Sequence, residues 1–248
     1  MTAKRIAFVT GGMGGLGEAI SRRLYDAGMT VAVSRSVGSK HATGWLEAER
    51  AAGRYFESYE MDVADYDACH STAERLLGEL GHVDVLVNNA GITCDRSFVK
   101  MAKADWDAVL RTDLDAIFNV TKPFVPGMIE RGFGRVVNIG SVNGSRGSFG
   151  QTNYSAAKAG LHGFTKALAL EVAKKGVTVN TVSPGYLATQ MVEAVPKDVM
   201  DTRILPQIPV GRLGHPDEIA ALVAFLCSDE AAFITGADIA INGGMHMQ

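Results

Sequence analysis

The sequence predicts a doubly wound α/β fold, with a parallel sheet that helices cover on both faces. Short apolar runs rich in β-branched residues alternate with longer segments of helical spacing along the whole chain. The apolar runs are nearly continuous and do not alternate with polar residues. This pattern is typical of parallel strands that are buried on both sides.

The expected strands and helices follow one another in regular order. The apolar runs predict strands over residues 6–9, 31–33, 54–60, 83–87, 136–139, 177–182 and 237–241. Helical spacing predicts helices over residues 16–27, 66–80, 105–124, 154–174 and 216–227. Residues 186–212 are the least periodic part, with Pro196, Pro206 and Pro209, so we expect a substrate lid there. Neither a linker nor a repeat divides the chain, which indicates a single domain over residues 1–248.

The composition excludes several classes of function. Hydrophobic residues make up 47% and charged residues 21% of the 248 residues, and the net charge is −3. These values are ordinary for a globular enzyme and favour no nucleic-acid or membrane partner. Cys69, Cys94 and Cys227 are widely spaced and odd in number, which favours free thiols, and the histidines show no metal-binding spacing. With neither a signal sequence nor a transmembrane stretch in view, we expect a cytoplasmic protein.

A glycine-rich turn directly follows the first expected strand, and a helical pattern starts at once. Small residues in such a turn let the backbone approach a pyrophosphate, and the helix N-terminus presents free N–H groups to it. The alternative is a flexible glycine loop without a ligand. The turn residues that we expect against a dinucleotide are Gly11, Gly12, Met13, Gly14, Gly15, Leu16 and Gly17.

The end of the second strand bears on the choice of dinucleotide. Ser34, Arg35 and Ser36 stand there, and no acidic residue follows before Glu47. NAD sites place an acidic residue near this point to bind the ribose 2′-hydroxyl, whereas a 2′-phosphate needs donors and cations. The sequence therefore favours NADP(H). A solvated loop arginine is the alternative interpretation of Arg35.

Further polar and small residues follow the third and fourth strands, where ligands bind in open α/β sheets. Asp62 can accept a hydrogen bond from an adenine amino group, although it can equally cap a helix. The residues expected around the adenosine are Asp62, Val63, Asn89, Ala90, Gly91 and Ile92.

The fifth strand ends at Ser141, and Tyr154 and Lys158 follow thirteen and seventeen residues later. Tyr and Lys at positions i and i+4 lie on one helix face. A phenol has a pKa near ~10, and a nearby ammonium favours its ionised form. We therefore expect Tyr154 to donate a proton to a carbonyl oxygen, Ser141 to hydrogen-bond that oxygen, and Lys158 to bind the nicotinamide ribose. The alternatives are a core tyrosine and a solvated lysine.

The turn after the sixth strand is expected to form the floor beside the nicotinamide. Its Pro-Gly pair sets a tight turn, and a threonine follows that can bond the carboxamide. The cofactor residues expected here are Pro184, Gly185, Leu187 and Thr189.

Taken in order, these motifs resemble the classical short-chain dehydrogenases/reductases over essentially the whole chain. The matching pieces are TGGMGGLG, DV, NNAG, the strand end at Ser141, YSAAK and SPGYLAT. The resemblance implies a single Rossmann-like domain with a seven-stranded parallel sheet, assembly as a homotetramer, and Tyr154 as acid/base with Ser141 and Lys158 as partners. The chain departs from the family at Asp113, where the family often has a catalytic Asn. An aspartate there would place a negative charge near Lys158.

Within the family, the segments around Tyr154 and the C-terminal INGGMHM most resemble bacterial acetoacetyl-CoA reductases. This resemblance implies NADPH-dependent reduction of acetoacetyl-CoA to (R)-3-hydroxybutyryl-CoA, which feeds polyhydroxybutyrate synthesis. The acyl thioester would then contact Asp95, Ser141, Ser148, Phe149, Gly150, Gln151, Gly185 and Tyr186. Reductases of 3-oxoacyl groups on acyl carrier protein share these motifs and remain an alternative. A catalytically idle NADP-binding sensor or assembly protein is a more distant one.

Overall fold

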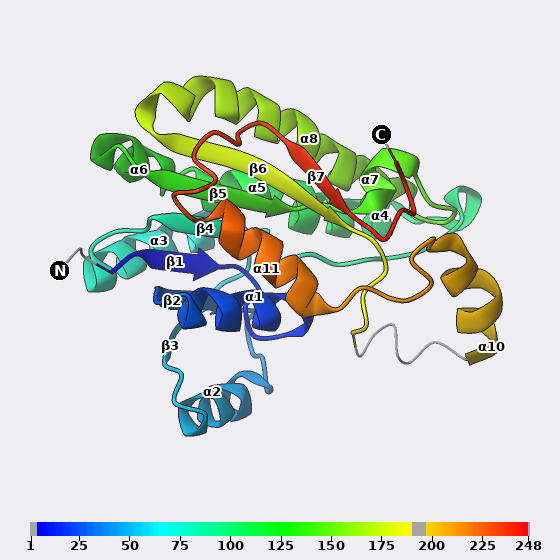
Figure 1. Ribbon diagram of the computed structural model, residues 1–248, viewed down its shortest axis with the longest axis horizontal. Helices are drawn as coiled ribbons and strands as arrows, with labels where there is room; N and C mark the ends of the chain where they lie inside the picture. The colour runs from blue at the N-terminus through cyan, green and yellow to red at the C-terminus, as the bar shows by residue number, and fades with distance from the viewer. Residues whose placement is uncertain (1–3, 190–196, 248) are drawn as a thin grey trace.

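One parallel sheet forms the centre of the molecule. The structure is a computed structural model that describes residues 4–189 and 197–247. The sheet has seven strands in the order β3-β2-β1-β4-β5-β6-β7, and every neighbouring pair is parallel (Figure 1). The strands are β1 (Ile6–Val9), β2 (Thr30–Arg35), β3 (Phe56–Glu60), β4 (Val85–Asn88), β5 (Gly134–Ile139), β6 (Val177–Pro184) and β7 (Asp238–Ile241).

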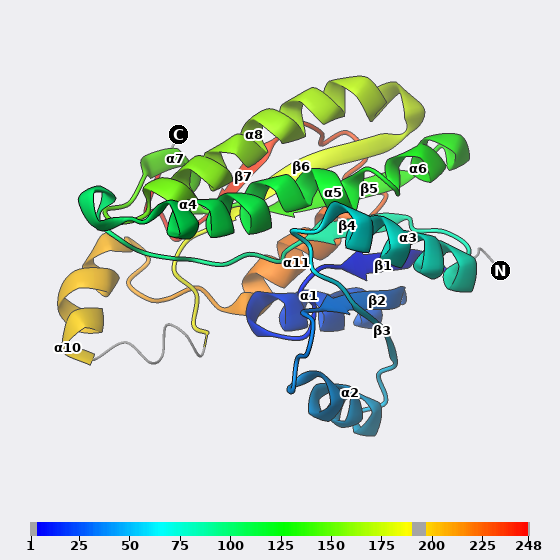
Figure 2. The same cartoon turned by 180° about the vertical axis from the view of Figure 1, so that it is seen from behind.

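Helices cover both faces of this sheet (Figures 1 and 2). One face carries α1 (Gly15–Asp26), α2 (Ala42–Ala51) and α11 (Pro216–Leu226). The other carries α3 (Tyr66–Leu80), α5 (Ala116–Thr121), α6 (Val125–Arg131) and α8 (Thr152–Val172), with α4 (Lys103–Leu110) packed on α8. The short helices α7 (Val142–Arg146) and α10 (Lys197–Val199) lie near the carboxyl ends of the strands.

Each face of the sheet has its own apolar core. In β1, the side chains of Ala7 and Val9 pack towards α1 and α11, and that of Phe8 packs towards α3 and α5. All three are 1% exposed or less. Fully burying one large apolar side chain contributes about 1.5–3 kcal/mol, so strands buried on both sides need apolar residues at consecutive positions. This confirms the fold class that the apolar runs predict.

The helix expected over residues 105–124 forms as one helical run over residues 103–121, with a π-helical segment inside it. Helix α4 ends at Leu110, a π-helical segment spans Arg111–Asp115, and α5 ends at Thr121. Pro123 follows closely, and its ring and missing N–H prevent the helix from continuing. The expected helix therefore forms with shifted bounds, and the π-helical segment that it contains carries Asp113.

Helices α2, α6 and α7 were not predicted, and α6 and α7 span only seven and five residues. The lid expected over residues 186–212 is described only in part, since residues 190–196 lie outside the described residues. Among the described helices, none is long and apolar enough to cross a membrane.

The strand order positions the site. Strands β2 and β4 lie on opposite sides of β1, so the chain crosses over in opposite directions at this point. Ligands in open α/β sheets bind in the crevice at the carboxyl ends of the strands where the order reverses. The loops after β1 and β4 flank this crevice.

Candidate active site

The glycine-rich turn after β1 is held by hydrogen bonds from two neighbouring strands. The backbone N–H of Gly11 donates to Ser34 Oγ at 3.0 Å, and the Asn89 side chain donates to the carbonyl of Thr10 at 3.0 Å. Thr10 Oγ1 in turn accepts from the N–H groups of Asn89 and Ala90 at 2.9 and 3.0 Å. A Cβ at Gly17 would lie 2.2 Å from the carbonyl oxygen of Gly11. The first turn of α1 therefore packs directly on the loop.

Three cavities meet around this turn and form one long groove. A cavity of about 750 Å³ runs along the ends of β2, β3 and β4, and one of about 660 Å³ adjoins it at Gly14 and Gly15. A third, of about 410 Å³, holds Ser141 and Tyr154 and shares Leu16 with the first and Thr189 with the second. A Cβ at Gly14 or Gly15 would meet open space, so the groove approaches the bare backbone at the N-terminus of α1. This arrangement fits a dinucleotide whose pyrophosphate lies at the helix N-terminus.

Most of the predicted adenosine-side residues line the largest cavity. They are Gly11, Gly14, Gly15, Leu16, Ser34, Ser36, Asp62, Val63, Asn89, Ala90, Gly91 and Ile92. Val37, Met61 and Thr112 also line it, and no motif in the sequence marks them. Two of the predicted polar side chains are engaged inside the protein, because Ser34 and Asn89 hold the glycine turn.

Four residues of the predicted turn and adenosine-side set do not line that cavity. Met13 is 6% exposed and packs in the core beneath α1. Gly12 and Gly17 face the protein, where a Cβ at Gly12 would lie 2.5 Å from Val33. The side chain of Arg35 lies beside the edge strand β3, where its guanidinium pairs with Glu60. These glycines shape the turn, and Arg35 has a partner that the sequence did not reveal.

Predicted catalytic, nicotinamide-side and substrate residues meet in the third cavity. Its lining includes Asp95, Ser141, Gln151, Tyr154, Pro184, Gly185, Tyr186, Leu187 and Thr189. Ser148, Phe149 and Gly150 do not line it. They form an outer loop in which Phe149 is 94% exposed and the carbonyl of Gly150 accepts from the N–H of Arg96 at 2.8 Å. Their assignment to the substrate remains a prediction.

Lys158 is buried and held by three neighbours. It is 4% exposed. Its Nζ donates to the carbonyl of Ile139 at 3.0 Å and lies 3.2 Å from Asp113 Oδ2. The same nitrogen lies 5.5 Å from the centre of the Tyr154 ring. A buried cation thus lies beside the phenol ring, as the i, i+4 spacing predicts.

Asp113 is the counter-ion of Lys158. It is fully buried in the π-helical segment, and its Oδ1 accepts from the N–H of Ile92 at 2.8 Å. Burial raises the pKa of Asp113, while the charge of Lys158 and the Ile92 N–H oppose that rise. A Cβ at Gly91 would lie 2.8 Å from Asp113 Oδ2, so a larger side chain there would displace the pair. Segments of π-helix are common at functional sites.

A chain of side-chain hydrogen bonds lies next to Ser141. The Oγ of Ser141 accepts from the backbone N–H of Asn143 at 3.2 Å and caps α7. The Asn143 side chain donates to Gln151 Oε1 at 2.8 Å, and Gln151 donates to Asp95 Oδ2 at 2.9 Å. All four residues line the cavity. Asn143 was missed because nothing in its local sequence distinguishes it from a surface helix residue.

Polar contacts fix α8 against the strands beneath it. Thr165 Oγ1 accepts from the Asn138 side chain at 2.9 Å and lies 2.7 Å from Thr181 Oγ1. Nearer the start of the same helix, His162 Nε2 lies 3.1 Å from Asp238 Oδ2. Together with the bond from Lys158 to β5, these contacts set the position of Tyr154 along the helix axis.

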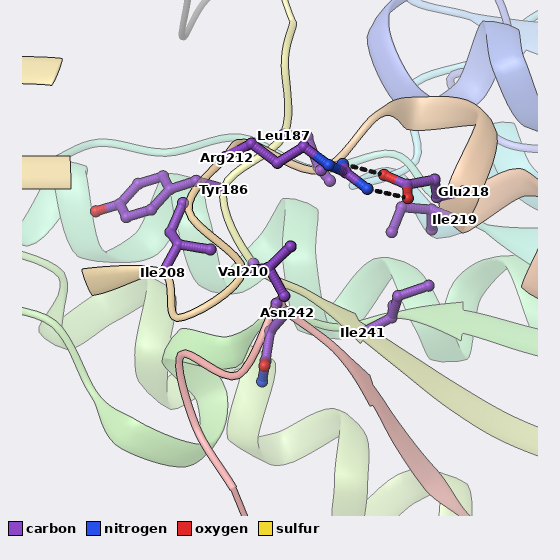
Figure 3. A pocket seen from close by; sticks show the side chains of 12 residues that line it. Tyr186, Leu187, Ile208, Val210, Arg212, Glu218, Ile219, Ile241 and Asn242 are labelled. Atoms are coloured by element: carbon purple, nitrogen blue, oxygen red, sulfur yellow. Dashed lines mark hydrogen bonds and ion pairs between the residues drawn. The ribbon is translucent and has the colours of Figure 1, made fainter. Parts of the chain in front are cut away.

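A small cavity of about 130 Å³ lies behind the turn at residues 185–187 (Figure 3). Arg212 closes one side, where it donates to both carboxylate oxygens of Glu218 at 2.8 and 2.7 Å. Arg212 and the N–H of His215 lower the pKa of Glu218 to about 2. The backbone of Gly214 pairs with Leu187, so this ion pair braces the segment that supports the floor of the third cavity.

Lys158 and Asp113 do not line the cavity that holds Tyr154, although the ammonium lies beside the Tyr154 ring. A groove at the N-terminus of α1 that reaches a tyrosine with a buried lysine beside it is typical of a class, the nicotinamide-dependent oxidoreductases built on a Rossmann-like sheet. The comparisons identify the family. A family model described as enoyl-(acyl carrier protein) reductase matches residues 11–246. The chain belongs to the short-chain dehydrogenase/reductase family, and it is an oxidoreductase of the kind that acts on CH–OH groups.

Similar proteins cover nearly the whole chain. An acetoacetyl-CoA reductase from Cupriavidus necator is 57% identical over 244 residues, which cover 98% of this chain and 99% of that protein. One from Shinella zoogloeoides is 54% identical over 240 residues, covering 97% and 98%. A 3-oxoacyl-[acyl-carrier-protein] reductase from Vibrio harveyi is 43% identical over 244 residues, covering 98% of each.

Proposed function

We propose that the protein reduces a 3-oxoacyl thioester with NADPH, and that its substrate is acetoacetyl-CoA, which becomes (R)-3-hydroxybutyryl-CoA. The observation that carries the proposal is the joint position of Ser141 and Tyr154 in one cavity that opens from the dinucleotide groove. The identities of 57% and 54% to acetoacetyl-CoA reductases, against 43% to a reductase of carrier-protein thioesters, favour the CoA substrate.

The proton chemistry is assigned to Tyr154 and Ser141. When bound, the reduced nicotinamide supplies a hydride to the carbonyl carbon. Tyr154 donates its hydroxyl proton to the carbonyl oxygen, so that the ketone becomes an alcohol. Ser141 donates a hydrogen bond to the same oxygen and holds it towards the phenol, while its Oγ keeps the bond from Asn143.

Lys158 and Asp113 support the phenol. The ammonium 5.5 Å from the Tyr154 ring stabilises the negative charge that develops on the phenol oxygen during proton transfer. Asp113 compensates part of this charge at 3.2 Å and holds Lys158 in place. With its remaining N–H groups, Lys158 binds the ribose hydroxyls next to the nicotinamide.

The cofactor is proposed to be NADP(H). Ser34 and Ser36 line the adenosine-side cavity, and Arg35 stands between them with a side chain long enough to turn towards it. No carboxylate follows β2 directly, which leaves donors and a cation where a 2′-phosphate would lie. The described part of the lid, residues 186–189 and 197–212, is proposed to close over the substrate within a single-domain chain.

A substrate panel tests these assignments. The rates with acetoacetyl-CoA, acetoacetyl-carrier protein and crotonyl-CoA would each be measured with NADPH and with NADH. We expect the highest kcat/KM for acetoacetyl-CoA with NADPH and no turnover of crotonyl-CoA, whose double bond offers no carbonyl carbon at the reacting position. A higher kcat/KM for the carrier-protein thioester would assign the protein to fatty-acid synthesis. An inactive protein that still binds NADPH would indicate a sensor.

The carrier-protein alternative rests on several cations of the chain. They suit the phosphates of CoA and the acidic surface of a carrier protein equally. They are Arg96, Lys100, Lys103, Arg146 and Lys197. Part of this charge is compensated, because Lys103 pairs with Asp107. The local excess of positive charge is therefore smaller than the sequence suggests.

We propose that the protein is a homotetramer that uses the face formed by α5, α6 and α8. A largely apolar groove of about 460 Å³ runs between these helices and includes Phe118, Ile129, Phe164 and Leu168. Phe118 is 51% exposed and Leu170 on α8 is 85% exposed. Exposed apolar area of this kind favours burial against a second copy. Light scattering after size-exclusion chromatography is expected to give four chains, and Phe118→Glu is expected to lower that number.

A further inference from the structure

Glu60 occupies a position next to the proposed 2′-phosphate site that the sequence did not indicate. It ends β3, the edge strand, and lies directly opposite Arg35 in the β2–β3 register. Its carboxylate forms an ion pair with the Arg35 guanidinium. The same carboxylate accepts from the backbone N–H of Gly38 at 3.2 Å. One side chain therefore holds both the arginine and the loop that follows it.

The pair lies apart from the residues that line the cavity. Ser34 and Ser36 line the adenosine-side cavity, whereas the side chain of Arg35 extends from the opposite face of the strand. The carboxylate bonds to one terminal nitrogen of the guanidinium. To contact a phosphate held by Ser34 and Ser36, Arg35 must turn around the end of β2, where the Glu60 carboxylate restrains it.

Glu60 stays ionised near neutral pH. The Gly38 N–H, and after it Arg35, hold the pKa of Glu60 below its usual value. The other charged groups of this loop are Lys40 and Asp62, of which Asp62 already accepts from the N–H of Ala64 at 2.9 Å. A phosphate that approaches Arg35 thus meets a nearly neutral pair instead of a free cation.

We propose that Glu60 is a second determinant of cofactor choice, which acts through Arg35 and weakens the preference for a 2′-phosphorylated dinucleotide below what Arg35 alone would give. The inference rests on the proposed function, since it takes NADP(H) as the cofactor. It follows that the protein prefers NADPH over NADH by a smaller factor than a chain with an uncharged residue at position 60 would.

The test compares dissociation constants for NADPH and NADH in five forms of the full-length protein: wild type, Glu60→Gln, Arg35→Ala, the double variant, and Glu57→Gln as a control. Glutamine keeps an acceptor for Gly38 and removes only the charge. Glu57 is exposed on the same strand and lies opposite Ala32, away from Arg35, so its variant matches the change in net charge.

We expect Glu60→Gln to bind NADPH about three- to tenfold more tightly at low ionic strength, with no gain for NADH, and with a smaller gain at about 0.3 M salt. The gain should be less than about twofold in the Arg35→Ala background, because the compensated charge is then absent. Glu57→Gln should bind both dinucleotides like the wild type.

Three results would overturn the proposal. Weaker NADPH binding in Glu60→Gln would mean that Glu60 orients Arg35 for the phosphate. An equal gain with and without Arg35 would mean that the carboxylate acts independently of the arginine. An equal gain in NADPH affinity in Glu57→Gln would mean that the effect comes from the net charge of the protein alone. The Arg35→Ala variant alone reports on the cofactor proposal, because unchanged NADPH binding there would refute NADP(H) recognition by Arg35 whatever Glu60 does.

Discussion

The two ends of the dinucleotide groove are built from different kinds of contact. At the catalytic end, Lys158 and Asp113 are 4% and 0% exposed and bind buried backbone groups as well as each other. At the adenosine end, the side chains of Arg35 and Glu60 are 29% and 42% exposed, and their pair lies on an edge strand. Both ends contain a cation paired with a carboxylate, yet only the first pair is isolated from water.

This difference indicates how each end should respond to the removal of one partner of its ion pair. Removing one partner of a buried pair leaves an uncompensated charge in a medium that solvates it poorly, so the change affects folding and catalysis together. An exposed pair is solvated and screened, so its loss alters ligand preference with little effect on stability. Substitutions at the catalytic end should therefore lower both stability and activity, and substitutions at the adenosine end should change the cofactor preference.

The largest effect is expected from Tyr154→Phe, which removes only the proposed acid. The value of kcat should fall about 10²- to 10⁴-fold, the usual contribution of general acid catalysis, while NADPH binding and the unfolding transition stay close to wild type. Steady-state kinetics with acetoacetyl-CoA provides the measurement. Tyr25→Phe, which removes a hydroxyl bonded to Gly53 far from the groove, is the matched control. Activity within threefold of wild type would exclude Tyr154 as the acid.

Lys158→Met tests the buried pair. The free energy of unfolding should fall by about 3–5 kcal/mol, because the Asp113 carboxylate is left without its counter-ion. The double variant Lys158→Met/Asp113→Asn should recover part of that loss, since it removes the stranded charge. Denaturant titration measures both values. A single variant as stable as the wild type would mean that the pair contributes nothing, and the contrast with the adenosine end would then disappear.

At the adenosine end, Arg35→Ala should raise the KM for NADPH about tenfold and change the KM for NADH by less than about twofold. The physical reason is the loss of one charge-assisted contact to the 2′-phosphate. The melting temperature should stay within the range of a surface substitution. Arg50→Ala, an exposed arginine on the nearby helix α2, serves as the control. Equal changes in both KM values would remove Arg35 from cofactor discrimination.

The smallest effect concerns the pH dependence of Asp113. Its pKa is raised in the folded state by burial, so the folded protein holds this proton to higher pH than the unfolded chain. The stabilisation of the folded state by this bound proton is complete below the unfolded pKa of about 3.9. It is lost as the pH rises through the pKa of Asp113 in the folded state. The stability of the wild type relative to Asp113→Asn should therefore decline with rising pH. Parallel denaturation profiles across pH would contradict a raised pKa.

Much of the fold follows from local patterns in the sequence. Consecutive apolar residues such as Ala7, Phe8 and Val9 predict a strand buried on both faces, and the structure places β1 at the same bounds. The helix over residues 66–80 was also predicted at its observed bounds. The π-helical segment at Arg111–Asp115 was not predicted, because the apolar spacing does not reveal a single π-helical turn inside a helix.

The residues of the candidate site likewise include some that the local sequence predicts and some that it does not. The glycine turn, Ser141 and the Tyr154–Lys158 spacing each depend on a few neighbouring residues, so the chain alone predicts them. Asn143 and Glu60 depend on partners that other elements bring to them. Phe149 was assigned to the acyl pocket by resemblance, and it lies 94% exposed outside the cavity lining.

The sequence by itself determined the order of strands and helices along the chain, the glycine-rich turn after β1, and the shared helix face of Tyr154 and Lys158. These features are set by backbone geometry over a single turn or strand, and the family resemblance in addition placed Asp113 near Lys158. Only the tertiary structure decided that Glu60 pairs with Arg35 and that the Lys158–Asp113 pair is buried. Electrostatic energy depends on distance in space and on burial, and both are fixed by strand order and helix packing.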